Sequence, residues 1–275
     1  MNKLLPYTAA FRAWFHTAMQ YRVSTLTSFI ARLWFGLVYV EIFHALYSNK
    51  LIHEPPISVG QAVTYVWLQQ ALIRLQPVSC DSEVANSIRT GTIVYDRIRP
   101  VDTYTLWYAR SLAKNLGPVL IIFVLIILFA GFILPLAGLG LWGMNPPESS
   151  TRYLLFIASA MLGILTATAL AVLMDTLAAA LLSPAGINAV AFTIVIFLSG
   201  SYIPLPLLPG IWATLSVLQP LASLIDIPSR IFTSSASSTA IPYLLAVQVF
   251  WLFALVVLGR YAMDRTMMRL QIQGG

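Results

Sequence analysis

The fold is decided by an eleven-residue apolar run, Val119-Leu120-Ile121-Ile122-Phe123-Val124-Leu125-Ile126-Ile127-Leu128-Phe129. No polar or charged side chain interrupts it, and mainly apolar residues extend it on both sides. A helix needs about 20 consecutive, mainly apolar residues to cross the hydrocarbon core of a bilayer. The sequence therefore predicts a transmembrane helix over about 115–141.

Five further stretches have the same character, at about 23–47, 57–76, 153–182, 187–203 and 240–260. The 57–76 stretch is the weakest, because Gln61, Gln69 and Gln70 interrupt it. Unpaired polar atoms are costly in hydrocarbon, so these amides are expected to face protein or a cavity. The predicted fold is an all-α membrane protein, a single transmembrane domain over 1–275 with six transmembrane helices.

The composition of the chain supports the membrane class. Of 275 residues, 59% are hydrophobic and 9% are charged, and the mean hydropathy is +0.81. Soluble domains have about 25% charged residues, so the chain has too few to cover a water-exposed surface. The net charge of +6 is read as a topology signal and does not indicate a nucleic-acid partner. Cys80 is the only cysteine, which excludes an intrachain disulfide.

The basic residues predict an orientation. With the N-terminus inside, eleven of them fall on cytoplasmic segments, namely Lys3, Arg12, Arg22, Arg89, Arg97, Arg99, Arg110, Lys114, Arg260, Arg265 and Arg269. Arg74 is expected at the same surface. Three fall on outer segments, namely Lys50, Arg152 and Arg230. Positive charge gathers on the cytoplasmic side of membrane proteins, so both termini are expected to be cytoplasmic.

Ahead of the first span, the 1–22 segment has an apolar helical face. Its members recur at steps of three and four residues, namely Leu4, Tyr7, Phe11, Trp14, Ala18 and Tyr21. Arg12, His16 and Gln20 lie elsewhere around the same helix. The pattern predicts a helix that lies in the inner membrane interface, in contact with lipids. The alternative is a frayed leader with accidental periodicity.

The longest predicted cytoplasmic segment is the 77–114 loop. Asp81 is a good N-cap for a short helix, and Glu83 suits the positive end of the helix dipole. Gly91 suits the left-handed residue that ends such a helix. Further along, Asp102 is expected to cap a helix that runs into the third span.

The same short helix is expected to have a docking face. Val84 and Ile88 lie one turn apart, and Arg89 lies in the last turn. The remaining positions are polar. These residues predict a helix parallel to the membrane that offers a small apolar knob. The alternative is an ordinary solvated loop whose charges only fix the topology.

The 201–238 segment is too apolar for a solvated loop, yet Pro204, Pro206, Pro209 and Pro220 prevent one continuous helix. Apolar backbone at membrane depth that does not span must be buried in protein or line a cavity. Short re-entrant helices on the outer side, before the last span, are therefore expected. The alternative is a broken span within a disordered outer loop.

Four ionisable residues fall inside the predicted spans, namely Arg32, Glu41, His44 and Asp175. Charged groups within spans are costly and are therefore functional candidates. Glu41 and His44 are three residues apart and share a helical face, so a Glu41–His44 pair is expected. Asp175 is expected to accept hydrogen bonds from Thr166 or Thr168, or to pair with a basic group. Each of the four is a candidate for a substrate pathway or, equally, for a structural pair at a helix interface.

Three motifs link the chain to a known family, namely Ile88-Arg89-Thr90-Gly91-Thr92-Ile93, Arg99-Pro100-Val101-Asp102 and Tyr108-Ala109-Arg110. They resemble the membrane subunits of type-2 ABC (ABC-2) transporters, most closely the bacterial six-span branch. The resemblance covers nearly the whole chain in layout, and its motif-like part is 81–110. It implies that 81–90 is a coupling helix that fits a groove on an ATPase subunit.

The resemblance implies a permease that forms half of an exporter in the bacterial cytoplasmic (inner) membrane. Six spans are half of the usual twelve, so it implies a second permease copy or paralogue, with two copies of the ATPase subunit. No cofactor is expected on the chain itself. Its sequence has no Walker-type phosphate loop, so ATP is expected to bind the partner subunit.

Two other classes remain as alternatives. A stand-alone secondary transporter needs ion-coupling carboxylates and paired broken helices, and only Asp175 and Glu41 are weak candidates for the carboxylates. A membrane-embedded enzyme needs a catalytic or metal site, whereas His16, His44 and His53 lack a metal-ligand spacing such as His-Glu-x-x-His. Neither a catalytic residue nor a metal site is predicted, and the ATPase-driven permease is favoured.

Overall fold

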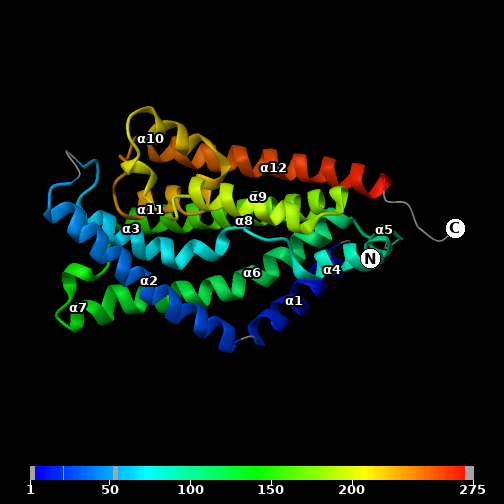
Figure 1. The fold of residues 1–275 in the computed structure, drawn as a ribbon, viewed down its shortest axis with the longest axis horizontal. Helices are drawn as coiled ribbons and strands as arrows, with labels where there is room; N and C mark the ends of the chain where they lie inside the picture. The colour runs from blue at the N-terminus through cyan, green and yellow to red at the C-terminus, as the bar shows by residue number, and fades with distance from the viewer. Residues whose placement is uncertain (1–3, 21, 52–54, 99, 270–275) are drawn as a thin grey trace.

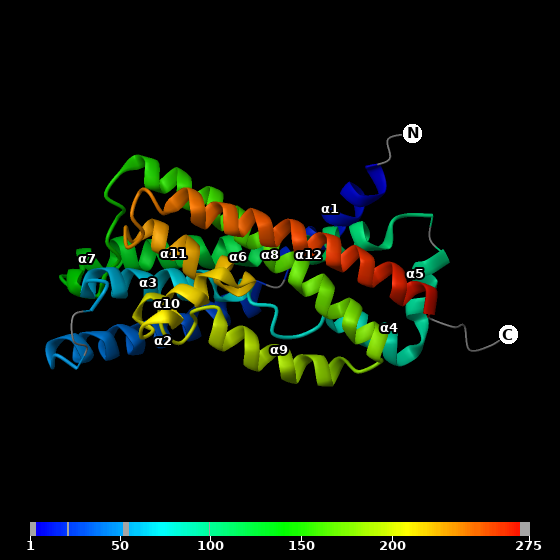
Figure 2. The same cartoon turned by 90° about the horizontal axis from the view of Figure 1, so that it is seen from above.

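The computed structural model describes residues 4–20, 22–51, 55–98 and 100–269, and every regular element within these ranges is helical (Figure 1). Long helices run side by side along the longest axis of the molecule, and short helices gather at its two ends (Figures 1 and 2). The prediction of an all-α fold is confirmed. Four residues used above, Lys3, Tyr21, His53 and Arg99, lie outside the described ranges.

Four helical segments of the described chain are long and apolar enough to cross a membrane, namely Val23–Ser48, Thr103–Leu136, Ser150–Leu181 and Ile241–Arg269. They correspond to the predicted first, third, fourth and sixth spans. Three of them lie in α2 (Arg22–Ser48), α8 (Ser150–Leu181) and α12 (Ile241–Arg269). The Thr103–Leu136 segment consists of α6 (Thr103–Leu128), a π-helical turn η3 (Phe129–Ile133) and α7 (Leu134–Leu136).

Helices also occupy the predicted second and fifth positions, but both are shorter than a typical span. The first of them, α3 (Val59–Leu72), has 14 residues and is followed by the 3-10 turn η1 (Ile73–Leu75). The other, α9 (Pro184–Leu198), has 15 residues. At 1.5 Å per residue each is roughly 21–23 Å long, against about 30 Å of hydrocarbon. The structure therefore has four of the six predicted helices at full spanning length and the other two as shorter helices.

The short helix α3 forms the centre of the bundle, and all its residues from Ala62 to Leu72 are buried. It begins with a capping box, in which the Ser58 hydroxyl accepts from the Gln61 backbone N–H and the Gln61 side-chain oxygen (Oε1) accepts from the Ser58 N–H. The Gln61 amide also donates to the Thr233 carbonyl at 3.0 Å. Gln69 and Gln70 are buried as well. The prediction that these amides face protein is confirmed.

The N-terminal helix α1 (Leu5–Gln20) packs along α6. A Cβ atom at Gly117 of α6 would lie 2.7 Å from the Met19 sulfur, so the two helices are in close contact. The predicted apolar face of α1 is partly buried, but α6 covers part of it where lipid contact was expected. Because this segment forms a helix packed on the bundle, the frayed-leader alternative is wrong.

At one end of the bundle lie α4 (Ser82–Thr90), η2 (Thr92–Val94) and α5 (Tyr95–Ile98), and η4 (Gly140–Trp142) lies near α7 at the other end (Figure 1). The predicted outer segment forms η5 (Leu205–Leu207), α10 (Ile211–Leu215), η6 (Ser216–Leu218), η7 (Pro220–Ser223) and α11 (Asp226–Phe232). This run of short helices replaces one continuous helix, as the prolines predict.

Ion pairing and carbonyl contacts hold α11 inside the bundle. Asp226 is 0% exposed, and its carboxylate accepts from Tyr65 Oη at 2.9 Å and from Arg230 Nε at 2.6 Å. Arg152, which was predicted on an outer segment, lies in the first turn of α8, where it is buried and donates to the Ala236 carbonyl at 3.0 Å. This carbonyl lies just beyond α11 and is a partner that the sequence does not reveal.

Candidate functional site

The sequence signals for the short helix α4 are confirmed at both ends. The Asp81 carboxylate accepts from the Glu83 N–H at 2.8 Å and so caps the helix. Gly91 has φ 74°, and its N–H donates to the Ile88 carbonyl at 3.2 Å. A residue other than glycine is disfavoured in this left-handed conformation. Local capping therefore fixes the length and position of α4.

The predicted exposed knob on α4 is wrong, because Val84 points into the protein. It is 1% exposed and packs in a cluster with Trp107 of α6, Val172 of α8 and Met263 of α12. Ile88 is half-buried against the same cluster. Spacing along the helix correctly places the two residues on one face, but it does not reveal that three long helices cover that face.

The outward face of α4 is polar. Its exposed residues are Ser82, Glu83, Asn86, Arg89 and Thr90. Within this face the Arg89 guanidinium donates to the Asn86 amide oxygen at 2.9 Å, and the Thr90 hydroxyl donates to the Asn86 carbonyl. Two of the predicted docking residues, Glu83 and Arg89, therefore face outward, whereas Val84 and Ile88 attach the helix to the bundle.

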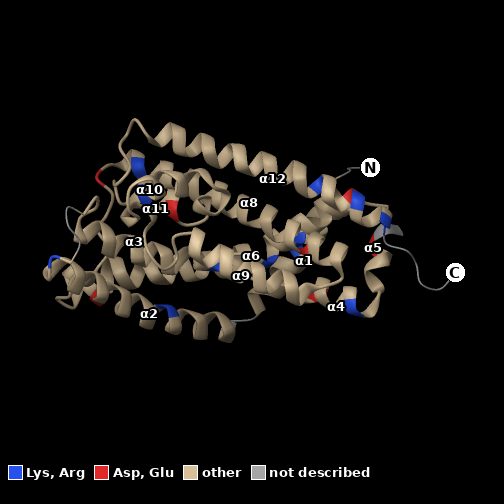
Figure 3. Ribbon diagram, turned by 45° about the horizontal axis from the view of Figure 1, so that its top comes forward, with Lys and Arg blue, Asp and Glu red and all other residues tan. Residues whose placement is uncertain are grey.

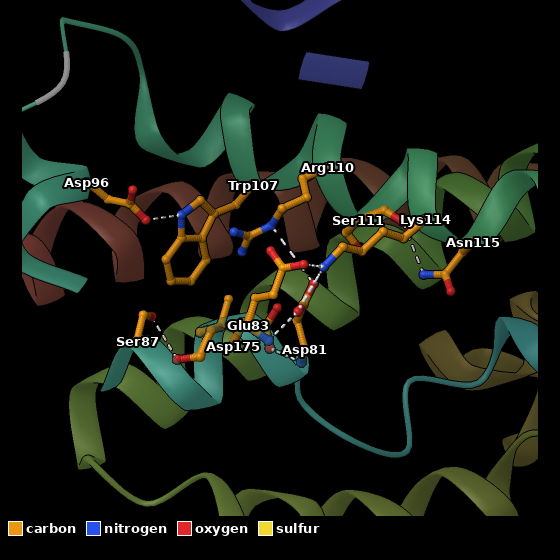
Figure 4. A network of polar contacts seen from close by, with 11 residues as sticks. Asp81, Glu83, Ser87, Asp96, Trp107, Arg110, Ser111, Lys114, Asn115 and Asp175 are labelled. Carbon is orange, nitrogen blue, oxygen red and sulfur yellow. Dashed lines mark hydrogen bonds and ion pairs between the residues drawn. The ribbon is translucent and has the colours of Figure 1, made fainter. Parts of the chain in front are cut away.

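Asp81 is the centre of a polar network at the start of α4 (Figure 4). Lys114 of α6 lies 2.7 Å from the Asp81 carboxylate and 3.2 Å from that of Glu83. The Arg110 Nε atom lies 3.9 Å from the same Asp81 oxygen. Burial acts to raise the pKa of Asp81, but the hydrogen bond and charge of Lys114, helped by Arg110, outweigh it. The pKa of Asp81 is therefore lowered from its ordinary value.

Backbone N–H groups tie the residues before α4 to two further helices. The Asp81 N–H donates to the Asp175 carboxylate of α8 at 2.8 Å. The Cys80 N–H donates to the Asn188 side chain of α9 at 2.7 Å. The expected threonine donors to Asp175 are wrong, since the Thr168 hydroxyl donates to the Ile164 carbonyl of its own helix. Asp175 thus has a structural partner 94 residues away in the chain.

Aromatic rings extend the network to α1. The Lys114 ammonium lies 4.4 Å from the centre of the Trp14 ring of α1, and the Arg110 guanidinium lies 5.2 Å from that of Trp107. The Trp107 indole N–H donates to the Asp96 carboxylate at 3.1 Å. Helix α4 and the residues just before it therefore contact α6, α8, α9 and α12, and Lys114 of α6 links this network to α1.

The other predicted span residues lie away from this network. His44 Nε2 lies 3.0 Å from the Leu141 carbonyl, and its ring stacks on Trp142. Glu41 is exposed, and within the described ranges the expected Glu41–His44 pair does not form. Arg32 donates to the Gln70 carbonyl at 3.2 Å. The structure therefore brings Asp81, Glu83 and Asp175 together but not the three candidates from the first span.

Lys114, Arg110, Trp14 and Asn188 were not predicted as partners in this network. Lys114 and Arg110 are separated by one helical turn, which is a usable sequence signal. Lys and Arg also gather at the end of the bundle that carries α4, α5 and the last turns of α12 (Figure 3). This gathering agrees with the positive segments used to predict the orientation.

The comparisons with known proteins are consistent with this arrangement. A family model described as ABC-2 type transporter matches residues 7–233. The matched range includes α4, its capping residues and every partner in its polar network. A comparison with curated proteins finds no significant match. The chain therefore belongs to the ABC-2 type transporter family and is an integral membrane permease component of a transporter.

Proposed function

We propose that the chain is the permease subunit of an exporter powered by a separate ATP-binding-cassette ATPase, and that it forms half of the translocation pathway. The ATPase binds ATP and the permease carries no cofactor. The complex would hold two ATPase copies and a second permease copy or paralogue. Membership of the ABC-2 family supports this proposal, because a permease without a phosphate loop needs an external source of energy.

The observation that carries the proposal is that one side of α4 is attached to the bundle while its other side is exposed. One side of the helix is fixed to the bundle by Val84 and by the Asp81 network, while the other side is exposed and polar. A helix attached in this way moves only together with the helices that hold it. We infer that the ATPase docks on the outward face, through Glu83 and Arg89, and displaces α4 as one body.

The contacts at Asp81 give such a displacement a route into the membrane part. Movement of α4 pulls on Asp175 through the 2.8 Å hydrogen bond and on Lys114 through the 2.7 Å ion pair. Both partners lie in helices long enough to span the membrane. In this proposal Asp81, Val84 and Ile88 transmit the movement of α4 to the long helices, and Gly91 is the C-terminal end of the segment that moves.

The proposed topology has six crossings, with both termini in the cytoplasm of a bacterial cell. In this arrangement α3 and α9 are the short second and fifth crossings. Two features support it: α3 is enclosed by protein, so it does not need to match the lipid thickness, and Lys and Arg gather at the α4 end (Figure 3). The outer short helices would then close the opposite side of the pathway.

The docking proposal is tested by co-purification of the chain with an ATP-binding-cassette ATPase from membranes of its native host. Arg89→Glu reverses a charge on the outward face without changing a buried contact, so we expect at least about a tenfold loss of associated ATPase, the effect of a good interface contact. The unfolding temperature should stay at the wild-type value. Arg265→Glu, at an exposed position in the last turns of α12, is the matched control and should retain the ATPase.

Two results would count against the proposed function. Wild-type ATPase levels with Arg89→Glu would place docking elsewhere on the chain. Movement of cargo by the purified chain alone, without any ATPase, would instead favour a secondary transporter.

A further inference from the structure

A second polar feature lies inside the bundle, between α2, the end of α3, α6 and α8. There a cavity of about 330 Å³ and another of about 320 Å³ meet at Arg74, which lines both. The first reaches Glu83 and Lys114 of the α4 network. The second is lined by Arg32 and Arg74 and is called the arginine cavity below.

Positive charge in the arginine cavity has no counter-charge from the protein. No residue that lines it is acidic, and among the described residues no carboxylate lies within ion-pair distance of Arg32 or Arg74. Within the described ranges Arg32 makes one hydrogen bond, to the Gln70 carbonyl, and its buried Nε has no partner there. A guanidinium has five N–H donors, so most of the donor capacity of Arg32 is free.

Arg32 is half-buried and Arg74 is exposed, and two guanidinium groups that line one cavity repel each other unless an anion or water joins them. Arginine forks match the oxygens of phosphate and carboxylate groups. The oxygens of one phosphate group can accept hydrogen bonds from two guanidinium groups at once, whereas one guanidinium group already occupies both oxygens of a carboxylate. The charge arrangement therefore favours a phosphate group as the ligand.

The rest of the lining indicates what carries the phosphate. Ile73, Leu75, Val78 and Ile164 supply apolar surface beside the two arginines. Ligand pockets have volumes of roughly 300–1,000 Å³, so a cavity of 320 Å³ holds a headgroup and little more. Only 17% of the 18-residue apolar window of the adjoining helix α2 is buried, which leaves room for an apolar tail along it in the lipid.

We propose that the arginine cavity binds the phosphate headgroup of an amphipathic anion between Arg32 and Arg74. As the cargo site of a permease it rests on the proposed function, whereas binding itself does not require an ATPase. Because Arg74 also lines the cavity that reaches Glu83 and Lys114, a bound anion lies next to the contacts that hold α4. Arg74 would therefore take part both in cargo binding and in the movement of α4.

The test measures binding of radiolabelled phosphatidic acid to the purified chain in micelles of a phosphate-free maltoside detergent, by scintillation proximity and without ATPase. The double variant with Arg32→Gln and Arg74→Gln should bind at least about tenfold more weakly, since both charge-assisted contacts are lost. Arg32→Lys should keep part of the affinity. Arg265→Gln, an exposed arginine outside the cavity, is the control and should bind like wild type.

A second variant keeps the test independent of the arginines. Ala171 lines the same cavity, so Ala171→Phe fills it without removing charge and should also abolish binding. Displacement by millimolar inorganic phosphate would identify free phosphate as a sufficient ligand, and no displacement would identify a lipid-borne headgroup. Wild-type affinity in both the double variant and Ala171→Phe would overturn the proposal, as would no binding by wild type. Either result would leave the ATPase docking on α4 untouched.

Discussion

Short helices occupy both ends of the bundle, but different contacts hold them. At one end α4 is attached on one side only, by Val84 and the partly exposed ion pairs of Lys114 with Asp81 and Glu83. At the other end six of the seven residues of α11 are buried, and the Asp226–Arg230 pair has no exposed carboxylate. One end therefore presents an exposed polar face, and the other end is sealed within the protein.

The largest loss of stability is expected when the buried ion pair of α11 is removed. Asp226→Ala leaves Arg230 without its charge partner and Tyr65 without its acceptor, so we expect a loss of about 3–5 kcal/mol in the free energy of unfolding. Asp81→Ala at the α4 end is the matched change and should cost clearly less, because Asp81 and Lys114 are partly exposed. Denaturant unfolding in micelles measures both, and equal losses would contradict the comparison.

Substitutions at two glycines distinguish the stability cost of close packing from the stability cost of an unusual backbone conformation. A Cβ at Gly163 of α8 would lie 2.7 Å from the Ser223 carbonyl of η7, so Gly163→Ala should cost about 1–3 kcal/mol by overpacking. Nothing lies within 4 Å of a Cβ at Gly91, but its φ of +74° makes Gly91→Ala cost about 1–2 kcal/mol.

Replacement by asparagine distinguishes the two causes. Asparagine tolerates the left-handed conformation, so Gly91→Asn should restore most of the stability lost in Gly91→Ala. Gly163→Asn should be worse than Gly163→Ala, because the side chain is larger at a crowded contact. Unfolding temperatures of the four variants measure this. A stable Gly163→Asn protein would show that η7 does not pack closely against α8.

The smallest effect concerns pH at the α4 end. Asp81→Asn keeps the helix cap but removes the ion pair, so wild type should be more stable at pH 7 by about 1 kcal/mol. The pKa of Asp81 is lower in the folded protein, so its contribution is present above the unfolded pKa of about 3.9. It is lost as the pH falls through the folded pKa. The difference in unfolding free energy between wild type and Asp81→Asn should therefore be constant from pH 8 to about 5 and shrink below about 4. A difference that becomes larger as the pH falls would contradict this prediction.

Local signals in the sequence predicted much of this site. The caps at Asp81, Gly91 and Asp102 all form, because each depends on one or two neighbouring residues. The direction of the Val84 face was missed, since helical periodicity shows which residues share a face but not which helices cover it. The Asp175 bond was missed for a related reason, because its donor is a backbone N–H without a sequence signature.

The sealed end could be predicted only in outline. Its prolines indicate short helices, but Asp226 was not identified as a buried group. The signal was present, since Asp226 lies in an apolar run and Arg230 follows at i+4. Tyr65 could not be found this way, because it lies 161 residues from Asp226 and has no periodic relation to it. The number of full-length spans also depends on where α3 and α9 end, and tertiary packing determines this.

The short, enclosed helix α3 has a consequence for how the chain is made. A segment of 14 residues with buried Gln69 and Gln70 is a poor candidate for independent partitioning from the insertion machinery into lipid. It packs against α2, which precedes it, but also against α6 and α11, which are translated after it. Biogenesis of this polypeptide is therefore expected to retain α3 at the translocon until those later segments emerge, and assembly cannot proceed strictly helix by helix.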